Sequence, residues 1–329
     1  MSHEGPIPPL LQVDGLVTEL TTPRGPVRPV DRVSFELPVQ GTLGIVGESG
    51  SGKSMLAMSI LGLLPRSTGR VIAGGVRYRG QELVGLAPAE MRKLRGRSLG
   101  LVFQEPMSAL NPVFTIGSQL TEPMRLHLGL SRRAARQRAL ELLASVGIAA
   151  PEDRIDAYPH ELSGGMRQRV MIAMAISCDP QVLIADEPTT ALDVTVQAQV
   201  LDLLARLQAE RAMGIVVITH DLGVVAEFVD HVMVMYAGRA VEYASTAHLF
   251  DNPLHPYTRG LLRSVPSHGQ RRLATIDGVV PDLAHLPGGC RFRSRCPDVR
   301  PRCAQAEPEP VALSGGRQVA CFVAQDTHV

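Results

Sequence analysis

Short apolar runs alternate with polar, glycine-rich or helical segments along most of the chain. Continuous apolar runs of strand length occupy residues 42–46, 182–185 and 215–219. Buried strands that alternate with helices are typical of a mostly parallel sheet covered by helices. Near the N-terminus the pattern changes to apolar and polar alternation between turn residues, over residues 11–17, 30–37 and 71–78. This second pattern predicts an antiparallel sheet beside the parallel one, so the chain as a whole is expected to be an α/β protein.

The pattern also predicts how the chain is divided. Residues 118–176 are largely helical in pattern. After Asn252 prolines and arginines become more frequent, and four of the five cysteines follow. We therefore expect a domain over residues 1–250, with a helical subdomain over about 105–178, and a C-terminal extension over 251–329.

Composition narrows the classes of function. The chain has 329 residues, 45% of them hydrophobic and 20% charged, and a formal net charge of +1. This is an ordinary globular composition, and it lacks the basic surplus of a dedicated nucleic-acid binder. No apolar run reaches the length of a membrane span, and the first residues do not read as a signal peptide. We expect a cytosolic protein whose cysteines are thiols or metal ligands rather than disulfides.

A phosphate-binding loop is the first candidate for chemistry. The segment that matches G-x-x-x-x-G-K-[ST] consists of Gly47, Glu48, Ser49, Gly50, Ser51, Gly52, Lys53 and Ser54. It follows a predicted strand and precedes a helical run, which is the context that this loop requires. Its backbone amides would surround phosphate, Lys53 would neutralise the β and γ oxygens, and the Ser54 hydroxyl would ligate Mg²⁺. Lys53 is one of only two lysines among 33 basic residues.

Paired carboxylates end the predicted strand at residues 182–185. Asp186 is expected to hold Mg²⁺, and Glu187 to polarise the water that attacks the phosphate. Two acids at a strand end could also be a solvated tip. The presence of a phosphate-binding loop in the same chain favours the catalytic interpretation.

A third segment, from Leu162 to Arg169, resembles the signature sequence of ATP-binding-cassette (ABC) ATPases. Ser163 can cap a helix over residues 166–176, while the free amides of Gly164 and Gly165 before it face outward and form an anion site. The resemblance covers the chain up to about residue 250 and implies a P-loop NTPase (RecA-like) fold with antiparallel β and helical subdomains. It also implies that this segment contacts the γ-phosphate held by an opposite subunit.

The same resemblance assigns three more residues. The resemblance implies that Gln104 senses the metal and the water and couples the ATPase to the membrane partner. It places Asp193 at the dimer seam and His220 at the γ-phosphate. An aromatic residue that stacks on adenine is usual in the family, but residues 17–21 contain none. Two rival classes remain: a soluble ABC ATPase that acts on ribosomes or DNA, and a small-molecule kinase, which leaves the Ser163 segment unexplained.

The C-terminal region narrows the resemblance. Residues 252–266 resemble the extension of ATPase subunits of oligopeptide and dipeptide importers, whose relatives also move nickel and glutathione. The resemblance implies two integral permease subunits, a second related ATPase or a homodimer, and a solute-binding protein that acts through the permease. It further implies a peripheral position on the cytoplasmic face of the membrane, and no nucleic-acid partner.

Four cysteines in the extension are candidate metal ligands. They are Cys290, Cys296, Cys303 and Cys321, spaced C-x5-C-x6-C-x17-C. Zinc sites favour tighter pairs, whereas an iron–sulfur cluster tolerates looser spacing, and its negative charge would be offset by the arginines nearby. The resemblance also points to a [4Fe–4S] cluster. Zinc and unmetallated thiols remain alternatives, and Cys178 is expected to be a small buried apolar residue.

Overall fold

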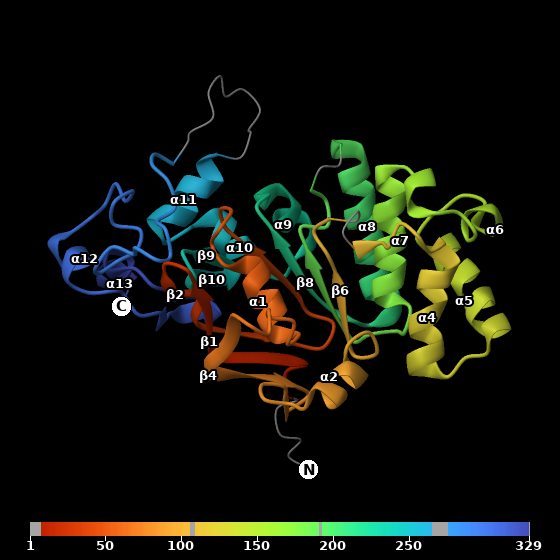
Figure 1. Cartoon of the computed structure of the whole chain (residues 1–329). Coiled ribbons are helices and arrows are strands. Elements are labelled where there is room, and N and C mark those ends of the chain that lie inside the picture. The colour runs from red at the N-terminus through yellow and green to blue at the C-terminus, as the bar shows by residue number, and fades with distance from the viewer. Residues whose placement is uncertain (1–7, 106–108, 191–192, 265–275, 329) are drawn as a thin grey trace, which may run out of the picture. The chain divides into compact units, whose positions relative to one another are not determined.

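The computed structural model describes residues 8–105, 109–190, 193–264 and 276–328 (Figure 1). The chain forms two compact units. The first unit combines Met1–Gly85 with Ile218–Val329, and the second unit is Leu86–Val217. The sequence predicts a domain boundary near residue 250, which is a different division of the chain from these two units. That boundary stays a prediction.

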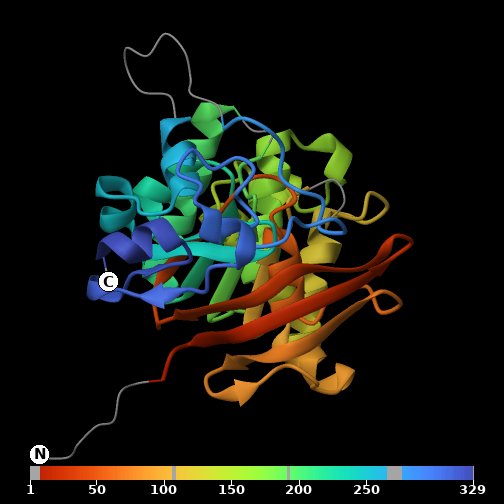
Figure 2. The ribbon, with the colours of Figure 1, turned by 90° about the vertical axis from the view of Figure 1, so that its left-hand side faces the viewer.

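An antiparallel sheet forms the N-terminal part of the first unit (Figure 2). Its strands are β1 (Leu11–Thr22), β2 (Gly25–Leu37), β4 (Gly69–Tyr78) and β5 (Gln81–Glu82), in the order β2-β1-β4-β5. Alternation along β2 explains the buried face, because Val33, Phe35 and Leu37 are buried while Ser34 and Glu36 are exposed. β1 continues beyond the predicted residue 17 because it stays paired with β2 as far as Thr22.

The first unit also contains five strands of a second sheet, in which every residue of the strand Thr42–Val46 is buried. These five strands are β3 (Thr42–Val46), β9 (His231–Tyr236), β10 (Arg239–Ser245), β12 (Gln318–Val319) and β11 (Val311–Ala312). β3 is parallel to β9, and the other pairs, β9 with β10, β10 with β12 and β12 with β11, are antiparallel. Helices of this part are α1 (Lys53–Ile60), α9 (Leu222–Phe228) and α10 (Thr246–Asp251). The extension thus adds two short strands to the edge of the sheet.

The rest of the extension packs on the same unit. It contains α11 (Pro256–Arg263), α12 (Pro301–Gln305), the 3-10 turn Ser314–Gly316 and α13 (Phe322–His328). Tyr236 of β9 makes edge-on ring contacts with Tyr257 and Phe292 of the extension, at centroid distances of 4.7 and 5.1 Å. The buried carboxylate of Glu242 in β10 accepts hydrogen bonds from the backbone amides of Leu254 and His255. The extension therefore shares a core with the unit, and it adds a smaller apolar cluster of its own around Leu254 and Val319.

The second unit is mainly helical. Its helices are α2 (Pro88–Leu94), α4 (Ile116–Leu128), α5 (Arg132–Ser145), α6 (Pro151–Arg154), the 3-10 turn Pro159–Glu161, α7 (Gly164–Ile176) and α8 (Val194–Arg211). β6 (Leu99–Val102) lies parallel to β7 (Val182–Asp186), and β8 (Gly214–Thr219) leads in sequence back to the first unit. The four longest helices begin at a side-chain cap that accepts a backbone N–H: Thr115, Ser131, Ser163 and Asp193. Of these four, α4, α5 and α7 lie almost entirely within the predicted helical residues 118–176, and Ser163 is a predicted cap.

Within the described residues, no helix is both long and apolar enough to cross a membrane.

Candidate functional site

The phosphate-binding loop connects β3 to α1 in the first unit. Gly47, Gly50 and Gly52 have positive φ angles of 156°, 79° and 104°. A Cβ atom at Gly52 would overlap the carbonyl oxygen of Pro29, and one at Gly47 would overlap that of Met235. Gly47 and Gly52 are therefore required for two reasons: their φ angles disfavour other residues, and there is no space for a side chain.

Lys53 lies at the first position of α1, and the residue is only 4% exposed. Its Nζ donates to the carbonyl oxygens of Gly47 and Glu48, at 2.7 and 3.1 Å. The loop thus holds a buried ammonium group beside the start of a helix, where backbone amides favour an anion. A bound phosphate would place negative charge beside this ammonium group.

Two residues of the extension hold the loop at Glu48. The backbone N–H of Glu48 donates to the hydroxyl of Tyr257 at 2.9 Å, and its carboxylate accepts from Arg295 at 2.9 Å. The Arg295 side chain is only 4% exposed. His255 supports Tyr257, because its Nδ1 accepts the Tyr257 amide, and burial lowers the pKa of His255 to about 3 so that the ring is neutral. Burial also raises the pKa of Tyr257, which keeps its hydroxyl protonated.

Sequence reasoning missed this contact. Tyr257 lies within the segment that resembles the importer extension, and Arg295 lies in its arginine-rich stretch. Their partner, however, is 209 and 247 residues away in sequence. No local pattern connects such distant positions.

The second unit brings Gln104 and Glu187 into contact. Gln104 follows β6, Glu187 follows β7, and these strands are neighbours. Gln104 Nε2 donates to the Glu187 carboxylate at 2.9 Å, and the Thr190 hydroxyl donates to the same oxygen at 2.7 Å. Glu187 has a positive φ of 46°, and Asp186 is buried at the end of β7. Two donors therefore orient the carboxylate that the sequence predicts as the base.

The Ser163 segment and Asp193 form a second local cluster in this unit. Ser163 Oγ accepts the amide of Met166, as predicted, but α7 begins at Gly164, so both glycines belong to its first turn. A Cβ on Gly165 would stand 3.1 Å from Val196, whose own amide donates to Asp193 Oδ1. The starts of α7 and α8 are therefore adjacent. The amides of a first helical turn lack acceptors within the helix, which leaves them suited to an anion.

His220 follows β8 and is exposed. The next residue, Asp221, caps α9 by accepting the amide of Gly223 at 2.8 Å. His220 and the phosphate-binding loop belong to the first unit. The Gln104–Glu187 pair, Asp186 and the α7–α8 cluster belong to the second.

The four cysteines of the extension are buried or partly buried. Burial is the main cause that raises the pKa of Cys290 to about 12 and that of Cys296 to about 11. The Cys290 amide donates to the Cys303 carbonyl at 2.8 Å. In the part of the chain that the structure describes, no group of three or more His, Cys, Asp or Glu side chains is arranged to hold a metal ion.

The arginines of this region have protein partners. Their pairs are Arg291 with Asp31 and Glu307, Arg295 with Glu48, and Arg300 with Asp326. The expectation that these side chains offset the charge of a cluster is therefore not supported for them. Cys178 is 4% exposed, in agreement with the prediction of a small buried residue.

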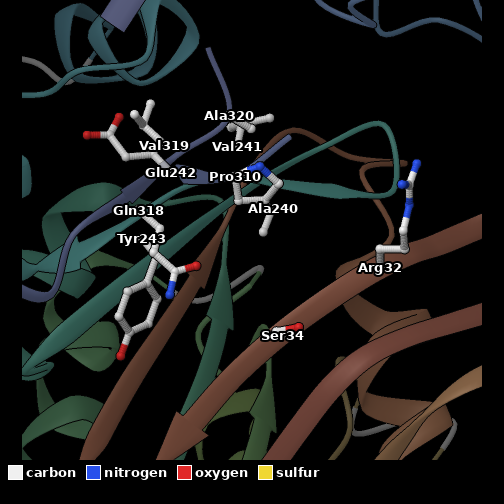
Figure 3. Close-up of a pocket in the computed structure, with 10 residues that line it drawn as sticks. All are labelled: Arg32, Ser34, Ala240, Val241, Glu242, Tyr243, Pro310, Gln318, Val319 and Ala320. Carbon is white, nitrogen blue, oxygen red and sulfur yellow. The ribbon is translucent and has the colours of Figure 1, made fainter. Parts of the chain in front are cut away.

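A small cavity of about 130 Å³ lies at the edge of the second sheet of the first unit (Figure 3). Residues of β2, β10 and β12 line it, together with Pro310 and Ala320. None of its lining residues belongs to the phosphate-binding loop, so it is not part of the candidate site.

The loop with its buried lysine and the α/β fold define the class of nucleoside-triphosphate-binding proteins. Comparison with known families then gives two matches. A family described as ABC transporter matches residues 30–190, and one described as oligopeptide/dipeptide transporter, C-terminal region, matches residues 241–303.

Individual relatives agree with these matches. The chain is 47% identical over 319 residues to the dipeptide transport ATP-binding protein DppD of Escherichia coli (strain K12), covering 96% of this chain and 97% of that protein. It is 51% identical over 316 residues to a Brucella abortus (strain 2308) protein provisionally named a peptide import ATP-binding protein, covering 95% and 94%. A solved dimeric ATP-binding cassette bound to ADP and Pi is 27% identical, with a TM-score of 0.65 over 72% of this chain and 98% of that one.

The chain belongs to the ABC transporter family, and it is an ATPase of that family. The predicted resemblance and the α/β P-loop fold are thereby confirmed. ATP and Mg²⁺ are the ligands expected for such a protein. The roles assigned to individual residues stay predictions.

Proposed function

We propose that this protein is the ATP-hydrolysing subunit of a membrane importer for dipeptides or oligopeptides. The observation that carries the proposal is the presence of a phosphate-binding loop and an oligopeptide/dipeptide transporter C-terminal region in one chain. The names of the relatives support peptides over nickel or glutathione as cargo. The protein would act at the cytoplasmic face of the membrane with two permease subunits and a second ATPase subunit. A solute-binding protein would act through the permease.

We assign the chemistry to side chains of both units. Lys53 would neutralise the phosphates, and Ser54, Gln104 and Asp186 would hold Mg²⁺. Hydroxyl, amide and carboxylate oxygens fit this hard cation, which would neutralise charge that develops on the phosphates. Glu187 would accept the proton of the attacking water, and His220 would contact the γ-phosphate.

A second subunit completes the proposed site. Ser163, Gly164 and Gly165 would contact the γ-phosphate bound by the opposite ATPase, and Asp193 would lie at the same seam. The first turns of α7 and α8 are adjacent, so the Ser163 segment and Asp193 lie close together. This proximity supports the assignment of both to one contact with the opposite subunit. A subunit on its own is expected to hydrolyse ATP slowly.

Co-purification tests the proposed function. The chain, carrying an affinity tag, should retain two integral membrane subunits from detergent extracts, and a peptide with its solute-binding protein should stimulate ATP hydrolysis of that complex. The cargo would be identified by comparing peptides with Ni²⁺ and glutathione. Retention of ribosomes or DNA, with full ATPase activity in the absence of membrane subunits, would favour the soluble ABC ATPase instead.

We further propose that Cys290, Cys296, Cys303 and Cys321 ligate a [4Fe–4S] cluster with a structural role. The support is the number of thiols in the extension and the backbone hydrogen bond of 2.8 Å that joins Cys290 to Cys303. When bound, the cluster would cross-link the end of the chain to the extension. Its ligands would be thiolates, so the positive charge of iron would have to overcome the raised pKa of Cys290 and Cys296.

Metal analysis tests this second proposal. Anaerobically purified protein should contain about four iron atoms per chain and absorb broadly in the visible range, as thiolate-ligated clusters do. Cys296→Ser should lower the iron content, whereas Cys178→Ser, at the buried cysteine outside the extension, should not. Colourless protein with about one zinc per chain would contradict the cluster and favour a zinc site at the same cysteines.

A further inference from the structure

Arg295 connects the phosphate-binding loop to a later segment of the extension. Besides the Glu48 carboxylate, its guanidinium donates to the carbonyl oxygens of Ile276 and Asp277, at 3.2 and 2.9 Å. It also lies 5.8 Å from the ring centroid of Tyr236. A single buried side chain therefore fixes the start of the segment 276–284 relative to the loop.

This segment encloses a cavity together with the loop. The cavity measures about 540 Å³ and has three walls: the turn between β1 and β2, the loop residues Ser49 and Gly50, and residues 280–284. Its apolar lining includes Pro23 from the turn and Val27 from the start of β2. The extension contributes Val280, Pro281 and Leu283. Arg24 and Asp282 form an exposed ion pair at 3.5 Å across the two outer walls.

We propose that residues 280–283 of the extension form one wall of the subsite for the base and ribose of the nucleotide. The inference rests on the proposed function, since it takes the loop as the holder of the phosphates. The cavity adjoins two residues of that loop, and its volume lies within the range of about 300–1,000 Å³ that is typical of small-molecule sites.

The chemistry of the lining suits the flat apolar faces of a purine. None of the described residues that line the cavity is aromatic, so aliphatic and proline side chains from two distant segments would take the place of a stacking ring. The extension would then contribute directly to ATP affinity. Any change that releases Arg295 from Glu48 would disturb the loop and the base subsite together.

Two adjacent valines give a matched test. Val280 lines the cavity, whereas Val279 is 83% exposed and does not. Val280→Asp should weaken ATP binding by about 10-fold or more, because a carboxylate would have to be desolvated against the base. Binding of inorganic triphosphate, which has no base, should change by less than about 2-fold. Val279→Asp should leave both affinities unchanged. Calorimetric titration of the full-length protein with each compound measures these values.

A milder variant separates this effect from misfolding. Val280 and Leu283 also pack against the core of the first unit, so an added charge could unfold the extension. Leu283→Ala adds no charge and should weaken ATP binding by about 3- to 10-fold, the range expected for removal of a buried aliphatic contact, with triphosphate binding preserved. If neither variant weakens ATP binding more than it weakens triphosphate binding, the extension is not a wall of the subsite.

The same titrations distinguish this inference from the proposed function. Failure of the wild-type protein to bind both ATP and triphosphate would overturn the phosphate-loop assignment and with it the subsite. Tight binding of both compounds by the wild type and by both variants would overturn the subsite alone.

Discussion

Lys53→Ala is expected to weaken ATP binding by about 10- to 150-fold and to reduce hydrolysis below detection. A hydrogen bond to a charged group contributes about 1.5–3 kcal/mol, which corresponds to that range of affinity. The loss in hydrolysis is larger because phosphoryl transfer depends on positioning and on neutralising charge that develops in the transition state. Lys53 is held by the carbonyls of Gly47 and Glu48, so its ammonium is positioned before any nucleotide arrives.

The other lysine of the chain provides the control. Lys93 lies in α2, its side chain is 72% exposed, and it pairs with Glu90 at 2.8 Å. An exposed pair of this kind contributes little to stability, so Lys93→Ala should bind and hydrolyse ATP as the wild type does. Titration with ATP and a phosphate-release assay on the assembled complex measure both quantities. Wild-type affinity in Lys53→Ala would mean that the loop does not bind phosphate.

Local signals allowed much of the fold to be predicted from the sequence. The apolar run at residues 182–185 predicts a buried strand because no polar side chain interrupts it, and the strand is present as β7. Ser163 predicts a helix start because its hydroxyl can accept a first-turn amide, and that hydrogen bond is present at 3.3 Å. Differences arise at element ends, where α7 includes the two glycines that were placed before it. Their amides lie in the first turn, so the proposed anion site is unaffected.

Long-range contacts were beyond the reach of pattern reasoning. The edge strand β12 is two residues long, and its place beside β10 is set by pairing with Glu242 and Tyr243. The contact between Glu48 and Arg295 joins two residues that separately resemble ordinary surface charges. Pairings of this kind depend on the assembled backbone, because neither partner carries a local signal for the other.

The candidate catalytic carboxylate illustrates both situations. Glu187 could be predicted from its place after an apolar strand and from the resemblance to a family. Its two donors, Gln104 and Thr190, fix the carboxylate oxygen at 2.9 and 2.7 Å, and this orientation became visible only in the structure. The arrangement makes a conservative substitution informative, because the oxygen of a glutamine can accept the same two hydrogen bonds.

Glu187→Gln is therefore expected to bind ATP normally but to hydrolyse it about 10²- to 10⁴-fold more slowly, the contribution typical of a positioned general base. The amide retains the shape and the acceptor oxygen but does not take a proton from water. In ATP and Mg²⁺ the variant should accumulate as a dimer on a sizing column, since the nucleotide that bridges two subunits is not consumed. Glu210→Gln, at a side chain of α8 that is 57% exposed, should turn over normally and serves as the matched control. Normal turnover by Glu187→Gln would assign the base elsewhere, and His220, at the end of β8, would be the next residue to replace.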